Sequence, residues 1–154
     1  KNEIIKSSEE VAEETSLNQK LSADQQIASA ILSAPIETRE EAMVYGYSES
    51  GEFIVLREGS NNFICIADDP QKDGFQVVSY HKSLEPMMKR GRELGAEEKT
   101  REEKEEIRQK EAKSGDMALP ENPATLHIYF GQDAYFDEEG APTILNILKQ
   151  ISNR

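Results

Sequence analysis

The sequence predicts an α+β domain in which a small antiparallel sheet, a meander of about four to five strands, packs with about three to four α-helices. Three observations lead to this fold class. Short apolar runs between Ala42 and Tyr80 alternate with turns rich in Gly, Asn, Ser and Asp, as in successive strands. Outside this stretch, apolar residues recur at helical spacing next to residues that cap helices. The length of 154 residues suits one domain with a single core.

Residues 1–21 are expected to lie outside this domain, which we place at residues 22–154. The segment is rich in Glu, Ser, Thr and Asn and has only scattered apolar residues. Burial of so few apolar groups does not offset the entropy that a chain loses on ordering. We therefore predict a disordered or frayed acidic tether, with an exposed helix as the alternative.

The domain is expected to begin with a helix and to continue with the strands. Ser22 or Asp24 caps a helix whose apolar residues Ile27 and Ile31 share one face, and Pro35 ends it. Gly-containing turns separate the first strands, which favours successive hairpins. Strands are predicted at residues 43–47, 52–57, 63–67, 75–80 and 125–130.

Three further helices are predicted, one of them mostly exposed to solvent. The first opens at Ser83, directly after the fourth strand. Thr100 and Glu103 form a capping box that begins the second, which ends at Gly115 and carries almost no large apolar residues. This helix contributes little to a core. The broad apolar face of Thr143–Ile151 predicts a terminal helix docked on the sheet.

The composition excludes several classes of partner and bond. The chain has 18 Lys and Arg against 30 Asp and Glu, a net charge of −12. We expect no nucleic-acid partner, because binding to phosphates requires clustered cations. No apolar run reaches the roughly 20 residues of a membrane-spanning helix, so no transmembrane segment is predicted. Cys65 is the only cysteine, which excludes an intramolecular disulfide, and it is expected to be a small buried residue.

Polar residues around the fourth strand and the following helix are candidates for a ligand-binding site. Tyr80 and His81 lie where strand gives way to helix, a place where binding groups are common. Lys89–Arg92 is the one dense basic cluster, and Arg90 and Arg92 suit a carboxylate or phosphate ligand. The alternative is that the cluster pairs with glutamates of the same chain: Glu85, Glu93 or Glu97.

His127 completes the set of candidate ligand-binding residues. It is expected on one strand face with Tyr129, while Leu126 and Ile128 take the other face. A polar or aromatic patch follows if the aliphatic face is buried. The alternative for His127 is a structural role.

No metal site or cofactor is expected. His81 and His127 are the only histidines, and neither has a histidine partner at helical spacing. The loop Asp69–Gly74 begins like a calcium loop, but Tyr80 stands at the twelfth position, where a bidentate Glu is required. The sequence also contains no Gly-rich phosphate loop and no nucleophile elbow. We therefore assign no catalytic residues, and the absence of these motifs favours a protein that is not an enzyme.

Several separate segments together carry a resemblance to known proteins: Leu56–Cys65, Tyr80–Met87, Arg90–Leu94, Leu119-Pro120 and Pro123–Leu126. They are similar to a family of uncharacterised exported bacterial proteins, in which the turn before a Cys usually reads Gly-Thr-Asn-Gly-Trp. This chain has Gly-Ser-Asn-Asn-Phe at residues 59–63, so it keeps an aromatic residue but not the Trp. The resemblance implies export to the periplasm or cell surface, with the leader as a tether. It implies no known activity.

Two functions agree with these observations. The first is a non-catalytic binding or interaction domain of the bacterial cell envelope, whose partner is an unknown protein or small molecule and for which a homodimer stays open. The tether, the small sheet and the lack of a reactive constellation favour it. The alternative is a small enzyme or small-molecule binder with a site around His81 and the Lys89–Arg92 cluster. That alternative requires these residues to meet in space.

Overall fold

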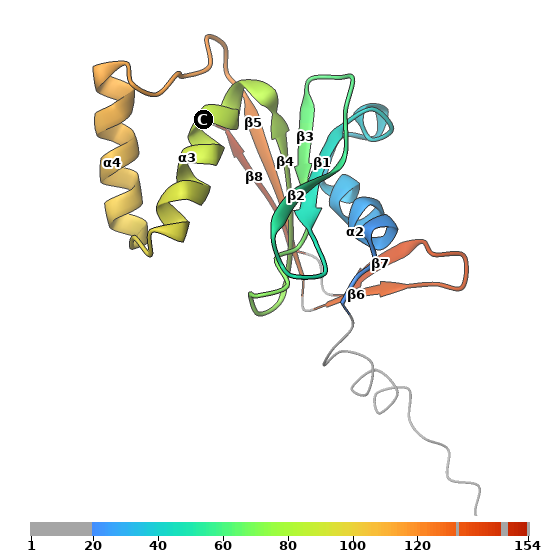
Figure 1. Cartoon of the computed structure of the whole chain (residues 1–154). Helices are drawn as coiled ribbons and strands as arrows, with labels where there is room; N and C mark the ends of the chain where they lie inside the picture. Colours follow the sequence, from blue (N-terminus) through green and yellow to red (C-terminus); the bar gives the residue numbers. More distant parts are fainter. Residues whose placement is uncertain (1–19, 132, 146–147, 154) are drawn as a thin grey trace, which may run out of the picture.

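The computed structural model describes residues 20–131, 133–145 and 148–153, and its main element is a six-stranded mixed sheet with the strand order β2-β1-β3-β4-β5-β8 (Figure 1). The predicted α+β class is confirmed, as are the strands predicted between residues 43 and 130. Of the predicted leader, residues 1–21, the first 19 lie outside the described residues. The strands of the sheet are β1 (Met43–Tyr47), β2 (Phe53–Arg57), β3 (Phe63–Ile66), β4 (Phe75–His81), β5 (Thr125–Gly131) and β8 (Leu148–Asn153). A separate hairpin contains β6 (Asp133–Phe136) and β7 (Pro142–Leu145).

The predicted meander is wrong, because β3 pairs in parallel with β1 and not with β2. The loop between β2 and β3 crosses the start of β1, where the backbone N–H groups of Ser60 and Asn61 donate to the carbonyl of Glu41 over 2.9 and 3.2 Å. A Cβ on Gly59 would lie 2.3 Å from the backbone nitrogen of Met43. The crossing therefore depends on a glycine at this point. The order of strands and turns in the sequence does not indicate that this loop crosses β1.

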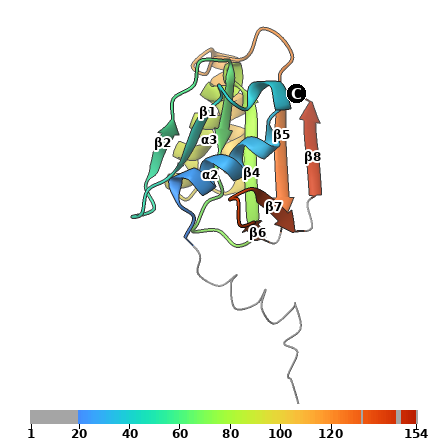
Figure 2. The ribbon, with the colours of Figure 1, turned by 90° about the vertical axis from the view of Figure 1, so that its right-hand side faces the viewer.

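Different helices cover the two faces of the sheet. Figure 1 shows α2 (Ala23–Ala30) on one face and α3 (Glu85–Ala96) on the other, and Figure 2 shows α2 lying across the strands. The buried apolar residues that cluster on the α2 face are Ala30, Ala34, Ala42, Val44, Cys65, Ala67, Phe75 and Val77. Those of the α3 face are Ile64, Val78, Tyr80, Leu84 and Ala124, with Met87 and Met88 packed against them.

Gln26 fixes α2 on the sheet. The helix begins with a capping box of Ser22 and Gln25, in agreement with the predicted start. The side-chain Nε2 of Gln26 donates to the carbonyl of Tyr47 over 2.9 Å, and its Oε1 accepts the Tyr47 N–H over 2.9 Å. Gln26 thereby satisfies both backbone groups of a strand residue, as a neighbouring strand would. Only 8% of its surface is exposed.

Helix α4 (Arg101–Ser114) lies on the far side of α3 from the sheet (Figure 1). The capping box of Thr100 and Glu103 begins it, and Gly115 ends it at a φ of 84°. None of its residues is buried, which confirms the predicted exposed helix. None of the described helices is long and apolar enough to cross a membrane.

The terminal helix predicted over Thr143–Ile151 is wrong. The chain forms β7 up to Leu145 and β8 from Leu148, and β8 runs antiparallel to β5 with Phe130 opposite Leu148. A short isoleucine-rich run fits a strand as well as a helix, because branched Cβ atoms favour extended backbone. These residues form a strand and not a helix because β5 offers them backbone hydrogen-bond partners along its edge.

Candidate functional site

Tyr80 and Arg92, two of the predicted site residues, meet on the α3 face of the sheet. The Tyr80 hydroxyl donates to Oε2 of Glu85, and Nη2 of Arg92 donates to Oε1 of the same carboxylate, each over 2.5 Å. Nη1 of Arg92 donates to the Tyr80 hydroxyl over 3.2 Å. Glu85 and Arg92 are seven residues apart on α3, so two helical turns bring them to the same side.

Aromatic rings from the outer strands cover the guanidinium of Arg92. Its Cζ lies 5.6 Å from the ring centre of Tyr45 and 5.0 Å from that of Phe53, and the two rings stack at 5.0 Å. Burial, reinforced by the carboxylate of Glu85, raises the pKa of Tyr80, so that the phenol stays protonated and donates to Glu85. Tyr80 and Arg92 are therefore engaged with their own chain.

His81 lies toward the opposite, α2 face. Its Nδ1 is 2.9 Å from Oγ of Ser83 and accepts the Ser83 backbone N–H over 3.2 Å, which caps the short 3-10 helix before α3. Its ring meets that of Phe63 edge to face at 6.1 Å, and Phe63 packs on the α2-face core. His81 therefore acts in the structure as a helix cap.

His127 also lies on the α2 face, opposite Ser79 of β4. Its neighbours Leu126 and Ile128 point to the other face, where they pack against Tyr80 and the α3 core. The pairing of His127 and Tyr129 on one face, as predicted, is confirmed by the contact of Tyr129 with the α2-face core. The sheet thus separates both histidines from Tyr80 and Arg92.

Arg90 joins α3 to α4. Its Nε and Nη2 donate to the carboxylate of Glu111 over 2.8 to 3.0 Å, and its Nη1 lies 3.3 Å from Glu93 and 4.0 Å from Glu97. Arg90 and Arg92 of the basic cluster therefore pair with glutamates of the same chain, which was the alternative prediction for this cluster. The sequence had not indicated Glu111. Arg90 is a positioning residue for α4, and the five candidate residues do not form one site.

Cys65 is buried on the α2 face, as predicted. Burial raises its pKa from 9.0 to about 12, so the thiol stays protonated at neutral and mildly alkaline pH. We expect a thiol reagent at about pH 8 to label the folded chain far more slowly than the chain in urea, because only the exposed thiol ionises and reacts readily. Labelling rates followed by mass spectrometry check this. Equal rates in the two states would contradict the buried position.

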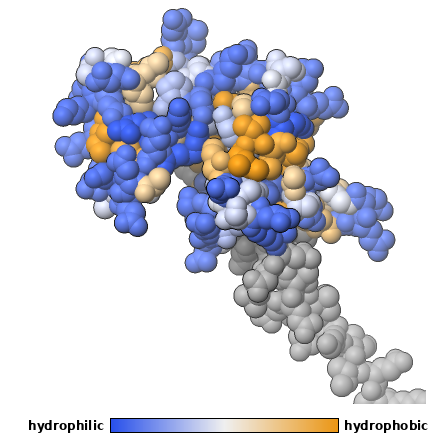
Figure 3. Space-filling model, in the orientation of Figure 1, coloured by the Kyte–Doolittle hydropathy of each residue, from blue (hydrophilic) through white to orange (hydrophobic). Residues whose placement is uncertain are grey.

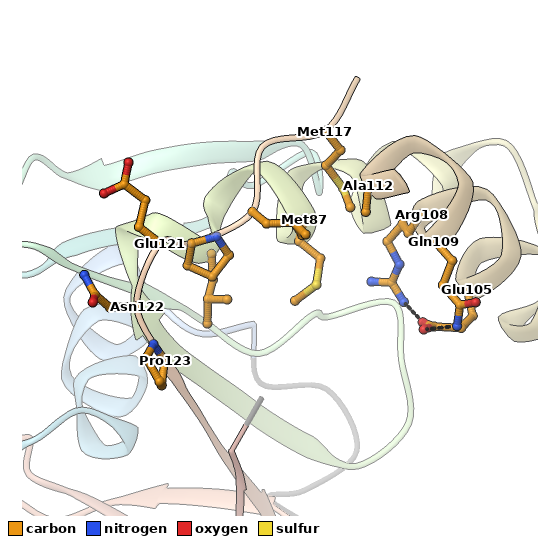
Figure 4. Close-up of a pocket in the computed structure, with 12 residues that line it drawn as sticks. Met87, Glu105, Arg108, Gln109, Ala112, Met117, Glu121, Asn122 and Pro123 are labelled. Atoms are coloured by element: carbon orange, nitrogen blue, oxygen red, sulfur yellow. Dashed lines mark hydrogen bonds and ion pairs between the residues drawn. The ribbon is translucent and has the colours of Figure 1, made fainter. Parts of the chain in front are cut away.

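A groove that the sequence did not indicate lies between α3, α4 and the connector from α4 to β5 (Figure 4). Its volume is about 460 Å³. Figure 4 shows Met87, Ala112 and Met117, from three different segments, arranged around the same space. The apolar lining consists of Leu84, Met87, Ala112, Met117, Leu119, Pro120 and Pro123.

Polar residues line the groove from two sides: Glu105, Arg108 and Gln109 from α4, and Glu121 and Asn122 from the connector. Glu105 accepts from Nη2 of Arg108 and from Nε2 of Gln109, each over 3.0 Å (Figure 4). Nε of Arg108 is buried and has no acceptor among the described residues. A mostly apolar groove with a small number of polar groups is the usual composition of a small-molecule site.

Small residues and prolines hold the walls of the groove in place. A Cβ on Gly91 would lie 3.2 Å from Nη1 of Arg108, and one on Gly95 would lie 3.3 Å from Nζ of Lys104, so these glycines let the side chains of α4 lie on α3. The connector has no regular secondary structure and bends at Glu121 and Asn122, between Pro120 and Pro123. The Gly91 to Gly95 spacing and the prolines were visible in the sequence, but neither shows which apolar residues face each other across the groove.

Among the described residues, no group of three or more His, Cys, Asp or Glu side chains is placed to hold a metal ion. The resemblance to exported bacterial proteins stays a prediction. Comparison with protein-family models, with curated proteins and with solved structures finds no match for this chain.

Proposed function

We propose that this chain is a non-catalytic binding domain of the bacterial cell envelope and that the groove between α3, α4 and the connector receives a small, largely apolar ligand. The observation that carries the proposal is the groove itself. Its volume of about 460 Å³ lies within the roughly 300–1,000 Å³ of sites for small molecules. Its lining combines seven apolar residues with five polar ones: Glu105, Arg108, Gln109, Glu121 and Asn122.

The engagement of the candidate reactive groups supports a non-catalytic role. Acid–base work requires a group within hydrogen-bond reach of a ligand. Tyr80 and Arg92 bond to Glu85, His81 caps a helix, and Cys65 is buried as a protonated thiol. None of these residues lines the groove. The location in the cell envelope rests on the resemblance of residues 56–65 and the other matching segments to exported proteins.

A variant that fills the groove tests this function. Ala112→Phe places a ring among the apolar side chains of the lining, so we expect it to weaken binding of anilinonaphthalene sulfonate, a fluorescent probe with apolar rings and one sulfonate group, by about tenfold or more, which corresponds to about 1.4 kcal/mol. Fluorescence titration gives the dissociation constant. A rise in Tm with probe concentration shows that the probe binds the folded chain.

The matched control is Lys110→Phe, which adds the same ring to an exposed position of α4 outside the groove. We expect it to leave the dissociation constant within about twofold of that of the parent chain. Circular dichroism verifies that both variants are folded. Equal effects of the two variants, or probe binding that does not saturate and does not raise the Tm, would refute the proposed site.

A further inference from the structure

Among the described residues, no strand pairs with the outer edge of β2, and this strand carries three exposed large apolar residues. It is the first strand in the order β2-β1-β3-β4-β5-β8, and Figure 2 shows no described element beyond it. Phe53, Ile54 and Val55 are 37%, 38% and 41% exposed. Over this strand, Figure 3 shows an apolar patch surrounded by hydrophilic surface. An edge of this kind pairs readily with another strand.

The strand lacks most of the features that keep sheet edges apart. Soluble proteins protect edges with Pro, with Lys or with an inward-pointing charge, and none of these occurs between Phe53 and Leu56. The aromatic ring of Phe53 is also held in place, because it stacks on Tyr45 at 5.0 Å and lies against Arg92. The apolar patch is therefore ordered before any partner arrives.

The backbone of β2 has a defined set of outward groups. The Ser48 N–H donates to the Glu52 carbonyl over 2.9 Å, so Glu52 directs its carbonyl toward β1. In an antiparallel pair, hydrogen-bonded and non-bonded positions alternate. Ile54 therefore directs its backbone groups to β1, as Glu52 does, while Phe53 and Val55 direct their N–H and C=O groups outward, away from the sheet.

A bulge limits how far the outer edge can pair. Val44 lies opposite Arg57 and Tyr45 lies opposite Val55, so Leu56 is an extra residue in β2. A bulge bends the strand and interrupts its ladder. The regular part of the free edge is therefore Phe53 to Val55, the same residues that are exposed.

We propose that β2 pairs antiparallel with β2 of a second copy of this chain, about a two-fold axis at Ile54. This register places Phe53 of each copy opposite Val55 of the other, with the two residues exchanging both backbone hydrogen bonds. It places the two Ile54 side chains opposite each other on the α2 face. Each exposed apolar residue thus meets an exposed apolar residue, and the two sheets become continuous.

Symmetry and the bulge select this register. In an antiparallel two-fold pair, opposite residues must point to the same face of the sheet, so the axis must pass through a residue and not between two residues. An axis at Val55 would bring Phe53 opposite Arg57, beyond the bulge. The axis at Ile54 keeps all paired residues within the regular part of the strand. A second copy is favoured over an unrelated strand because this register sets the exposed apolar residues Phe53, Ile54 and Val55 against one another.

Sedimentation of the chain tests the pairing, and cysteine cross-linking tests the register. Ile54→Cys brings two Cβ atoms together in a non-hydrogen-bonded pair, with a Cα separation of about 4.5 Å that a disulfide spans. Val55→Cys is the matched control, because its two copies are diagonal neighbours about 7–8 Å apart. The native Cys65 is buried and does not interfere.

We expect sedimentation of the parent chain to show a concentration-dependent species of twice the chain mass. Under mild oxidation, Ile54→Cys forms a disulfide-linked dimer, while Val55→Cys forms no disulfide between its copies. Ile54→Lys abolishes the dimer without lowering the Tm of the monomer. Added salt tightens the dimer, because it screens the repulsion between two chains of net charge −12.

Two results would overturn the proposal. One is a parent chain that stays monomeric at all concentrations up to about 1 mM, a range that includes weak association. The other is a dimer in which Val55→Cys cross-links as well as Ile54→Cys, or that survives Ile54→Lys. The groove test is independent, since Ala112 is not part of β2.

Discussion

Replacement of Gly59 by alanine is expected to destabilise the domain by about 4 kcal/mol or more, a large part of the stability of an ordinary domain. The added methyl would lie 2.3 Å from the Met43 nitrogen and 2.8 Å from the Glu41 carbonyl oxygen, which are both backbone atoms. Packed backbone does not move aside as a flexible side chain does. The loop therefore has to leave the start of β1, and the hydrogen bonds of Ser60 and Asn61 to Glu41 are lost with it.

Ser60→Ala is the matched control for this change. It alters the next residue of the same loop but keeps the backbone N–H that donates to Glu41. Its effect should stay within about 0.5 kcal/mol. Urea unfolding followed by circular dichroism measures both variants. A Gly59→Ala chain that is within about 1 kcal/mol of the parent would show that the loop does not cross β1 as closely as described.

Replacement of Gln26 by leucine is expected to cost about 2–4 kcal/mol, because it leaves two part-buried backbone groups without partners. Leucine fills a volume similar to that of glutamine, so the loss comes mainly from the two hydrogen bonds to the N–H and C=O of Tyr47. The contact between α2 and β1 should weaken first. Thermal and urea unfolding measure the change, and hydrogen exchange of the Tyr47 amide reports on the local opening.

The same substitution at Gln76 is the control. Gln76 is an exposed residue of β4, and its backbone N–H, which donates to Asp68 over 2.8 Å, is unchanged by a new side chain. Gln76→Leu should therefore stay within about 0.5 kcal/mol of the parent. If the two glutamine variants lose equal stability, the side chain of Gln26 is not the link between α2 and the sheet.

The Gly59 and Gln26 variants test two parts of the fold and do not test the proposed binding groove. Gly59 holds the order of the strands, and thereby leaves β2 at the free edge of the sheet. Gln26 holds the helix that covers the face opposite α3. Neither residue lines the groove, so stability loss at these sites and probe binding at the groove are separate measurements.

Local chemistry in the sequence was sufficient for most of the elements. The capping residues Ser22 and Thr100 placed the starts of α2 and α4, and the apolar runs placed β1 to β5. Each of these features depends on residues within a few positions of one another, so a reading along the chain finds them. The same reading was wrong for β8, where a short apolar run suits either element.

The candidate site was less accessible from the sequence. Tyr80, His81, Arg90, Arg92 and His127 were chosen for their chemical types, and the structure distributes them over two sheet faces and a helix–helix contact. The side chains that line the groove are mostly ordinary apolar residues, such as Met87 and Ala112. Their chemical types do not mark them, and they line a common groove only because α4 lies on the far side of α3 from the sheet.

The sequence by itself determined the α+β class, the positions of the first five strands, the exposed character of α4 and the burial of Cys65. These follow from periodicity, capping and composition, which are local properties of the chain. Only the tertiary structure decided that β3 pairs with β1, that β8 extends the sheet, and that no described strand pairs with the outer edge of β2. Each of these depends on contacts between distant segments, and no local pattern records which distant segments meet.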